Sequence, residues 1–246
     1  MLDNNTIITG ILFIAAVIRG YTGFGFAAIA ILVLSTQYPV AHAVPAVLFI
    51  DLLIAIPLVF SSFKETDYSR LRPILIATLL GIPIGFLSLN YLSDITLRIM
   101  VPAVILFLAI LPSIKSNTTD RIVNSPWLCG LISGWTTSAV SAGGTPVVIH
   151  LRHSQLAISI QRATLITYFF ITTSLSVGLF YFLDPKIYLL DKHHDGIILI
   201  CLSGVILGKA LFKWKNASLI HHFSYYFILI LSAWLLLQSG VKAITF

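Results

Sequence analysis

The chain has 246 residues, of which 58% are hydrophobic and only 10% are charged, and its mean hydropathy is +0.98. A soluble domain carries about 25% charged residues, so this composition indicates a polytopic membrane protein and excludes a separate soluble domain. The net charge of +6 is typical of basic residues in cytoplasmic loops, and we do not expect nucleic acid as a partner.

The first half of the chain contains one interrupted and three continuous apolar segments. The N-terminus lacks the basic start of a cleavable signal peptide, so we expect the first segment, about 6–35, to stay in the protein. Arg19-Gly20-Tyr21-Thr22-Gly23-Phe24-Gly25-Phe26 interrupts it. The stretches 43–61, 71–90 and 96–114 are long enough to cross a hydrocarbon core of about 30 Å.

The second half repeats this pattern after a polar stretch. Residues 116–125 are the predicted linker between repeats 1–115 and 126–246. The segment 126–151 is interrupted by a run from Gly134 to Pro146, and apolar stretches follow at 162–183, 195–212 and 222–240. Gly25 aligns with Gly144 at an offset of 119 residues. The sequence predicts an all-α membrane protein of two pseudo-symmetric halves.

Paired glycines extend the repeat beyond the interruptions. Gly81 and Gly85 align with Gly204 and Gly208 at an offset of 123 residues. A spacing of four lets helices approach closely in lipid, so we interpret these four glycines as packing residues.

Lys and Arg counts favour one topology. If both interrupted segments cross the membrane, Lys and Arg divide eight to six between the two sides; if each enters and leaves on one side, they divide ten to four. Cytoplasmic loops carry an excess of Lys and Arg, which favours re-entrant hairpins. The expected first arm, 7–18, has 12 residues and rises only about 18 Å. A hairpin plus three crossings makes the halves inverted.

The first interruption predicts an anion site at Arg19, Gly23, Phe24 and Gly25. Arginine at membrane depth is costly and faces a cavity or a partner. The helix that resumes after the glycines presents free N–H groups and the positive end of its dipole, and glycine allows a ligand close to the backbone. Two alternatives stay open for Arg19: it snorkels to the interface, or it only pairs with a carboxylate.

The second interruption supplies Ser141, Gly143, Gly144 and Thr145, followed by Pro146. Proline fits the first turn of a resuming helix, and the hydroxyl groups add hydrogen-bond donors. If the hairpins are inverted, two positive helix ends converge on one small anion. Glycine for tight packing alone is the alternative.

Three further polar positions are weaker candidates. Asp51 lies within an apolar run, where a carboxylate is rare and tends to be functional; it either pairs with Arg19 or takes up a proton coupled to transport, and the sequence does not separate these. His42, Gln161 and Arg162 are expected to line the cavity or its mouth, although Arg162 fits equally well as a positive-inside anchor.

Other chemistry is not indicated. Cys129 and Cys201 are interpreted as buried small residues. The pairs His193-His194 and His221-His222 have no surrounding ligand set, so we expect neither a metal nor another cofactor. Enzyme motifs such as Walker A are missing from the sequence, so we do not expect an enzyme.

These features together resemble the sulfite exporter TauE/SafE family, within the toluene sulfonate uptake permease superfamily, over about residues 8–240. The resemblance implies transport of sulfite or organosulfonates across a bacterial inner membrane, in either direction. The family's glycine motifs fall on Gly20, Gly23 and Gly25, and on Gly134, Ser141, Gly143, Gly144 and Pro146. Phe26, Ala27 and Ala28 in the first motif, and Ser141 and Ala142 in the second, depart from the family's glycine density. A bulkier lining predicts an altered substrate size and argues against inorganic sulfite.

The function predicted from the sequence is secondary transport of a small anion, a sulfur oxyanion or an organosulfonate, by alternating access. The expected partners are that anion, the lipid bilayer and a coupling proton or ion, and a homo-oligomer is left open. A passive anion channel and a non-transporting membrane subunit are the alternatives.

Overall fold

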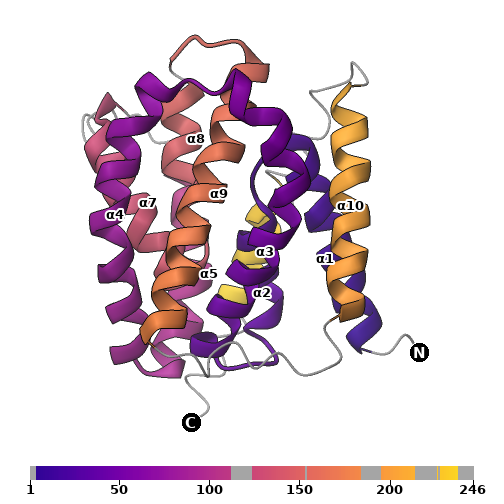
Figure 1. Ribbon diagram of the computed structural model, residues 1–246. Helices are drawn as coiled ribbons and strands as arrows, with labels where there is room; N and C mark the ends of the chain where they lie inside the picture. Colours follow the sequence, from indigo (N-terminus) through magenta and orange to yellow (C-terminus); the bar gives the residue numbers. More distant parts are fainter. Residues whose placement is uncertain are drawn as a thin grey trace.

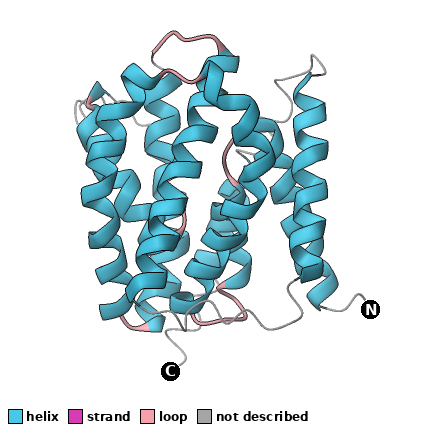
Figure 2. Cartoon of the chain, viewed as in Figure 1, coloured by secondary structure: helices cyan, strands magenta, loops and turns pink. Residues whose placement is uncertain are grey.

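The structure is a computed structural model that describes residues 4–111, 124–152, 154–183, 195–213, 226 and 228–237. Every regular element in these ranges is helical (Figure 2). The longer helices run side by side in one bundle (Figure 1). This arrangement confirms the all-α prediction.

The helices follow the predicted segments. The first half forms α1 (Asn4–Thr22), α2 (Phe26–Leu34), α3 (Val40–Ser62), the 3-10 turn η1 (Phe63–Glu65), α4 (Tyr68–Tyr91) and α5 (Asp94–Ile110). The second half forms α7 (Pro126–Val140), α8 (Gly144–Arg152), α9 (Ile158–Leu183), α10 (Asp195–Lys213) and a helix at 228–237. The predicted linker lies mostly outside the described residues, as do both histidine pairs, so the division into 1–115 and 126–246 stays a prediction.

Several helices have the length and surface of membrane spans. Three described helical stretches, Val40–Glu65, Tyr68–Tyr91 and Ile158–Leu183, are long and apolar enough to cross a membrane, and shorter apolar helices accompany them. Large apolar side chains are exposed along α4, among them Ile76, Leu80 and Ile84. Exposed apolar surface of this extent suits contact with lipid.

The first break is shorter than the sequence suggested. Helix α1 continues through Arg19, Gly20 and Thr22, and only residues 23–25 are non-helical before α2. The expected arm of 12 residues is therefore wrong: α1 has 19 residues and rises about 28 Å at about 1.5 Å per residue. The return arm α2 is the short one, with nine residues.

Gly20 lies within helix α1 and allows the close packing of a neighbouring helix. A Cβ at Gly20 would lie 2.2 Å from the carbonyl oxygen of Val205 in α10. Gly23 and Gly25 instead have φ angles of 87° and 98°, a conformation that glycine adopts without steric cost. The first glycine motif therefore divides into one packing residue and two break residues.

Glycines also bring α10 against α1 and α7 against α4. A Cβ at Gly208 would lie 2.1 Å from the carbonyl oxygen of Val17 in α1, and one at Gly81 would lie 2.3 Å from that of Leu131 in α7. Gly85 and Gly204 make similar contacts with the partner backbones. The packing role predicted for these four glycines is confirmed.

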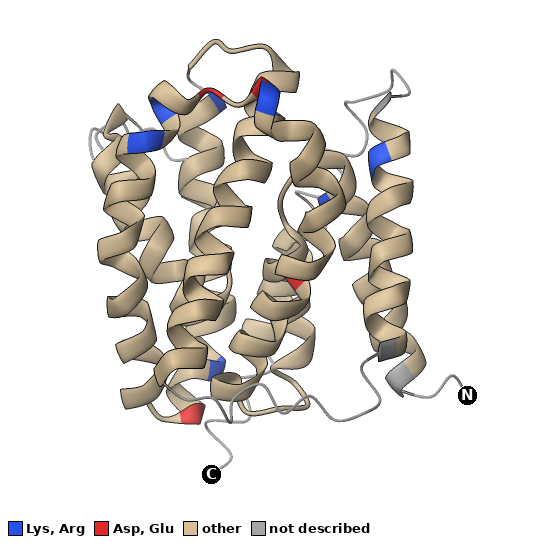
Figure 3. Cartoon of the chain, viewed as in Figure 1, with Lys and Arg blue, Asp and Glu red and all other residues tan. Residues whose placement is uncertain are grey.

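Charged residues lie at both ends of the bundle (Figure 3). Arg98 of α5 donates to the carbonyls of Ser35 and Tyr38 just beyond α2, and its partner Asp94 accepts from the Val40 backbone N–H at 2.8 Å. At the opposite end Asp67 caps α4. Hydrogen bonds from the Ser69 hydroxyl and from the α4 backbone lower the pKa of the Asp67 carboxyl.

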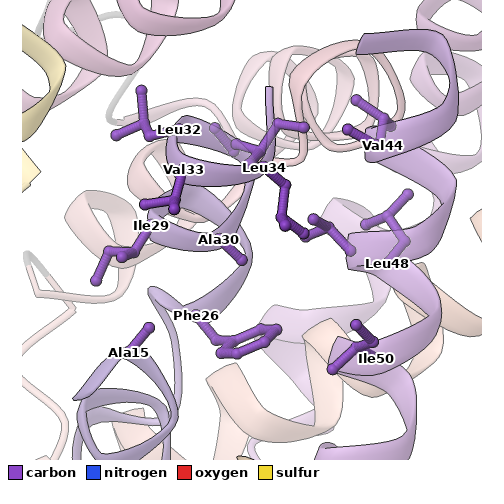
Figure 4. Close-up of a cluster of buried hydrophobic side chains, with 14 of the residues drawn as sticks. Ala15, Phe26, Ile29, Ala30, Leu32, Val33, Leu34, Val44, Leu48 and Ile50 are labelled. Atoms are coloured by element: carbon purple, nitrogen blue, oxygen red, sulfur yellow. The ribbon is translucent and has the colours of Figure 1, made fainter. Parts of the chain in front are cut away.

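The apolar core lies around the short helix α2. Seven of its nine residues are buried, and Figure 4 shows Phe26 and Leu34 of α2 facing Leu48 and Ile50 of α3. Helix α2 is therefore enclosed by protein, which keeps the nearby break away from lipid.

Replacing Gly208 by Ala tests the α1–α10 contact. The added Cβ meets backbone that a rotamer change cannot move, so we expect a loss of stability of about 1–3 kcal/mol, typical of overpacking. Gly178→Ala is the matched control, because nothing lies within 4 Å of a Cβ there. Thermal unfolding of purified protein in detergent measures both, and equal stability of the two variants would contradict the contact.

Candidate functional site

One central cavity collects most of the residues singled out in the sequence. Its polar and backbone lining comes from both breaks and from α1, α3, α7, α8 and α9, and the rest is apolar. The residues that line it are Arg19, Phe24, Gly25, Ala27, Ala28, Leu48, Asp51, Ile105, Thr137, Ser141, Ala142, Gly143, Gly144, Thr145, Phe169, Thr173 and Ile228. The space open to the centre of a water-sized sphere is about 50 Å³.

A buried ion pair joins α1 to α3 at this cavity. Arg19 Nη2 lies 3.1 Å from Asp51 Oδ2, and the two side chains are only 2% and 3% exposed. Arg19 Nη1 donates to the Gly23 carbonyl at 2.7 Å, and the guanidinium carbon lies 5.0 Å from the centre of the Phe169 ring. The structure thus contains the Arg19–Asp51 pair that was one of the two options for Asp51.

The pair leaves hydrogen-bonding capacity unused. Arg19 Nε and Asp51 Oδ1 have no hydrogen-bond partner among the described residues. An unsatisfied buried polar atom costs about 1–3 kcal/mol or more when the group is charged. Both side chains line the cavity, so a ligand there could satisfy one of these atoms.

The first break places the start of α2 at the cavity. Gly25 precedes the helix without a side-chain cap, and Gly25, Ala27 and Ala28 line the cavity. The first-turn amides of a helix have no partner within the helix and carry the positive end of its dipole. Backbone donors from α2 therefore lie close to the Arg19 guanidinium.

The second break contributes the start of α8 in the same way. Ser141 ends α7 in the left-handed conformation with φ 55°, and Gly143, Gly144 and Thr145 line the cavity. A Cβ at Gly144 would lie 2.9 Å from the Phe169 ring, so this glycine gives the ring its place beside Arg19. Pro146 lies in the first turn of α8, as predicted.

Buried hydroxyl groups on α4, α7 and α9 hold the second break in place by hydrogen bonds. Tyr168 of α9 donates to Ser133 Oγ at 2.7 Å, and Ser133 donates to the Gly143 carbonyl. Thr78 of α4 lies 2.9 Å from the Tyr168 hydroxyl. The breaks differ accordingly, because arginine holds the first and a chain of hydroxyls holds the second.

Four predicted residues do not line the cavity. Gly23 lies in the first break and supplies the carbonyl that Arg19 bonds. His42 is exposed near the start of α3, and Gln161 donates to the Leu156 carbonyl at 2.7 Å. Arg162 donates to the carbonyls of the α1 end, as described next.

Arg162 caps α1. Its Nε and Nη2 donate to the carbonyls of Tyr21 and Gly20 at 2.8 and 2.5 Å, and its guanidinium stacks 4.2 Å from the Phe212 ring centre. Cationic groups are favoured at a helix C-terminus. Arg162 therefore holds the last turn of α1 in place and does not line the cavity; the interpretation as a positive-inside anchor stays a prediction.

Sequence reasoning missed the contribution of α9. Thr164, Tyr168, Thr172 and Ser176 are fully buried and recur every four residues, so they follow one face of the helix. Polar residues repeated on one face of an apolar helix indicate a face turned to the protein interior. That spacing was the available signal for the neighbouring cavity residues Phe169 and Thr173.

No group of three or more His, Cys, Asp or Glu side chains comes together within the described ranges. Cys129 and Cys201 are both buried, and they do not form a disulfide with each other. Their burial agrees with their interpretation as small core residues.

The comparisons with known proteins decide the family. The sequence profile described as Sulfite exporter TauE/SafE matches residues 8–235, nearly the whole chain. The chain belongs to this family. It is therefore an integral membrane protein of an anion transporter family rather than of an enzyme family. No curated protein and no solved structure matches the chain.

The energetics of the buried pair can be tested by a double-mutant cycle. Arg19→Met leaves the Asp51 charge buried without its partner, so we expect a loss of about 3–5 kcal/mol. Adding Asp51→Asn removes that charge and should recover most of the loss. Thermal unfolding of the single and double variants measures the coupling, and simple addition of the two single effects would contradict a direct pair.

Proposed function

We propose that this protein is a multi-pass secondary transporter of the bacterial inner membrane that carries a small sulfur-containing anion by alternating access. The observation that carries the proposal is the convergence of Arg19 and two helix starts on one buried cavity. Arginine, helix N-termini and glycine backbone are the groups that proteins use to bind oxyanions. Family membership supports the same class of substrate.

We propose that Arg19 and the backbone at Gly25 contact the anion from one side, and that Gly144 and Thr145 contact it from the other. The apolar side chains around these groups exclude water and so strengthen the electrostatic attraction. Phe24 and Phe169 lie at the same cavity and limit its size. Ser141 and Gly143 form the turn of the second break and line the cavity beside the start of α8.

The packing supports the inverted repeat. Helix α1 of the first half pairs with α10 of the second, and α7 of the second half pairs with α4 of the first. Exchanging the halves converts one pairing into the other, since α1 corresponds to α7 and α4 to α10. Inverted repeats with interrupted helices at a central site are a common plan for alternating access.

The cavity volume favours the smaller anions of the class. One water molecule needs about 10–15 Å³ on this measure of volume. A cavity of about 50 Å³ therefore accommodates only a few non-hydrogen atoms. Ala27 and Ala28, which depart from the family's glycine pattern, line this space and reduce it. We therefore favour an anion the size of sulfite over an aromatic sulfonate, which reverses the sequence-based argument against inorganic sulfite: the bulkier lining shrinks the cavity and so disfavours the larger anions.

Flux into proteoliposomes tests the transporter. We expect labelled sulfite to enter with saturation, and to enter faster when unlabelled sulfite is present inside, because a carrier exchanges its ligand across the membrane. Flux without saturation would favour a passive channel. A folded preparation without any sulfite flux would contradict the proposal and favour a non-transporting subunit.

The role of Arg19 is tested by the neutral double variant Arg19→Gln with Asp51→Asn, which leaves no unpaired buried charge. We expect its sulfite flux to fall at least a hundredfold, since a lost charged hydrogen bond of about 1.5–3 kcal/mol adds to the lost attraction. Lys64→Gln, at an exposed position in η1, is the matched control and should keep wild-type flux. Retained flux in the double variant would remove Arg19 from the site.

Competition tests the size of the substrate. We expect unlabelled methanesulfonate to inhibit sulfite uptake measurably, whereas 4-toluenesulfonate at the same concentration should leave it unchanged because the ring does not fit. Equal inhibition by the two anions would contradict the limit set by Phe24 and Phe169.

A further inference from the structure

The further inference concerns the charge balance of the cavity and rests on the proposed function. Among the described residues that line it, Arg19 and Asp51 alone carry a formal charge, and they neutralise each other. An anion that enters this cavity therefore adds an uncompensated negative charge next to a buried carboxylate. Such a charge is costly in a medium of low dielectric constant.

Among the described residues, the surroundings of Asp51 contain no cation other than Arg19 that is placed to compensate its charge. Arg19 of α1 is the charged group that faces it, and α9 presents the uncharged Thr173. Arg162 is occupied with the α1 carbonyls, and the ammonium of Lys209 on α10 donates to the Pro57 carbonyl at 2.8 Å. The cavity linings from α2, α5, α7 and the helix at 228–237 are uncharged at their described positions.

The Arg19 guanidinium divides its hydrogen bonds between Gly23 and Asp51, so an anion can replace Asp51 without disturbing the bond to Gly23. Nη1 is held by the Gly23 carbonyl, Nη2 by Asp51, and Nε has no partner among the described residues. Asp51 Oδ1 is also without a partner there. A proton on Asp51 would cancel its charge and turn the carboxyl into a hydrogen-bond donor, which leaves the guanidinium charge for the anion.

We propose that Asp51 is the coupling group of this transporter: the anion replaces the Asp51 carboxylate as the counter-charge of Arg19, and Asp51 takes up one proton for each monovalent anion bound. In the empty cavity the ion pair is neutral. In the loaded cavity Arg19, the anion and the protonated carboxyl again sum to zero. Anion and proton therefore cross the membrane in the same direction.

Linkage gives the sign of the pH dependence. Because the loaded state holds one more proton than the empty state, sulfite binding weakens as pH rises, up to tenfold per pH unit for one proton. Sulfite itself also takes up a proton as the pH falls. The contribution of Asp51 is therefore the difference in pH dependence between the wild type and the Asp51→Asn variant. Asp51→Asn keeps the shape of the protonated carboxyl and cannot titrate, and its own binding curve reports sulfite alone.

The experiment is calorimetric titration of sulfite into purified wild type and Asp51→Asn, across a pH series and in two buffers of different ionisation enthalpy. We expect the wild type to take up about one more proton per sulfite than the variant, and its affinity to fall more steeply with pH. Asp67→Asn, at a half-buried helix cap outside the cavity, is the matched control and should behave as wild type. If Asp51→Asn does not fold, Asp51→Ser provides the same comparison.

The outcomes separate the two proposals. Equal proton uptake and equal pH dependence in wild type and variant would overturn Asp51 as the coupling group while leaving sulfite transport intact. Absence of sulfite binding by the wild type in the same titrations would overturn the proposed function itself.

Discussion

A backbone interrupted inside a membrane protein must have its polar groups satisfied by the protein, because lipid offers no replacement for water. The first break meets this constraint with two arginines. The Gly23 N–H donates to the Arg19 carbonyl, Arg162 takes the Gly20 and Tyr21 carbonyls, and the Arg19 side chain takes the Gly23 carbonyl. The end of α1 is therefore held almost completely, whereas the start of α2 has no side-chain cap.

Arg19 accordingly has two tasks that depend on each other. It closes the break by bonding Gly23, and it places a positive charge beside the uncapped start of α2. Asp51 makes the buried charge tolerable in the empty state, since an unpaired arginine here would be strongly destabilising. In our proposal, the ion pair that stabilises Arg19 in the protein interior is also the one that an incoming anion must rearrange.

The two breaks reach similar geometry by different chemistry. In the second break the chain from Tyr168 through Ser133 holds the Gly143 carbonyl, and no charged side chain is involved within the described contacts. This difference concentrates the charge on one side of the cavity. It also explains why the first break carries the coupling chemistry in our proposal, while the second contributes backbone and hydroxyl donors.

The sequence by itself determined the helical class, the positions of both breaks, and the charged and glycine residues of the cavity. These features are local: glycine runs, a lone arginine and a lone aspartate stand out in apolar segments because burial makes them costly. Only the tertiary structure decided that Arg19 pairs with Asp51, that Gly20 packs instead of breaking α1, and that Arg162 caps a helix more than 140 residues away in sequence. Such contacts depend on which helices become neighbours, and no short-range pattern in the chain carries that information.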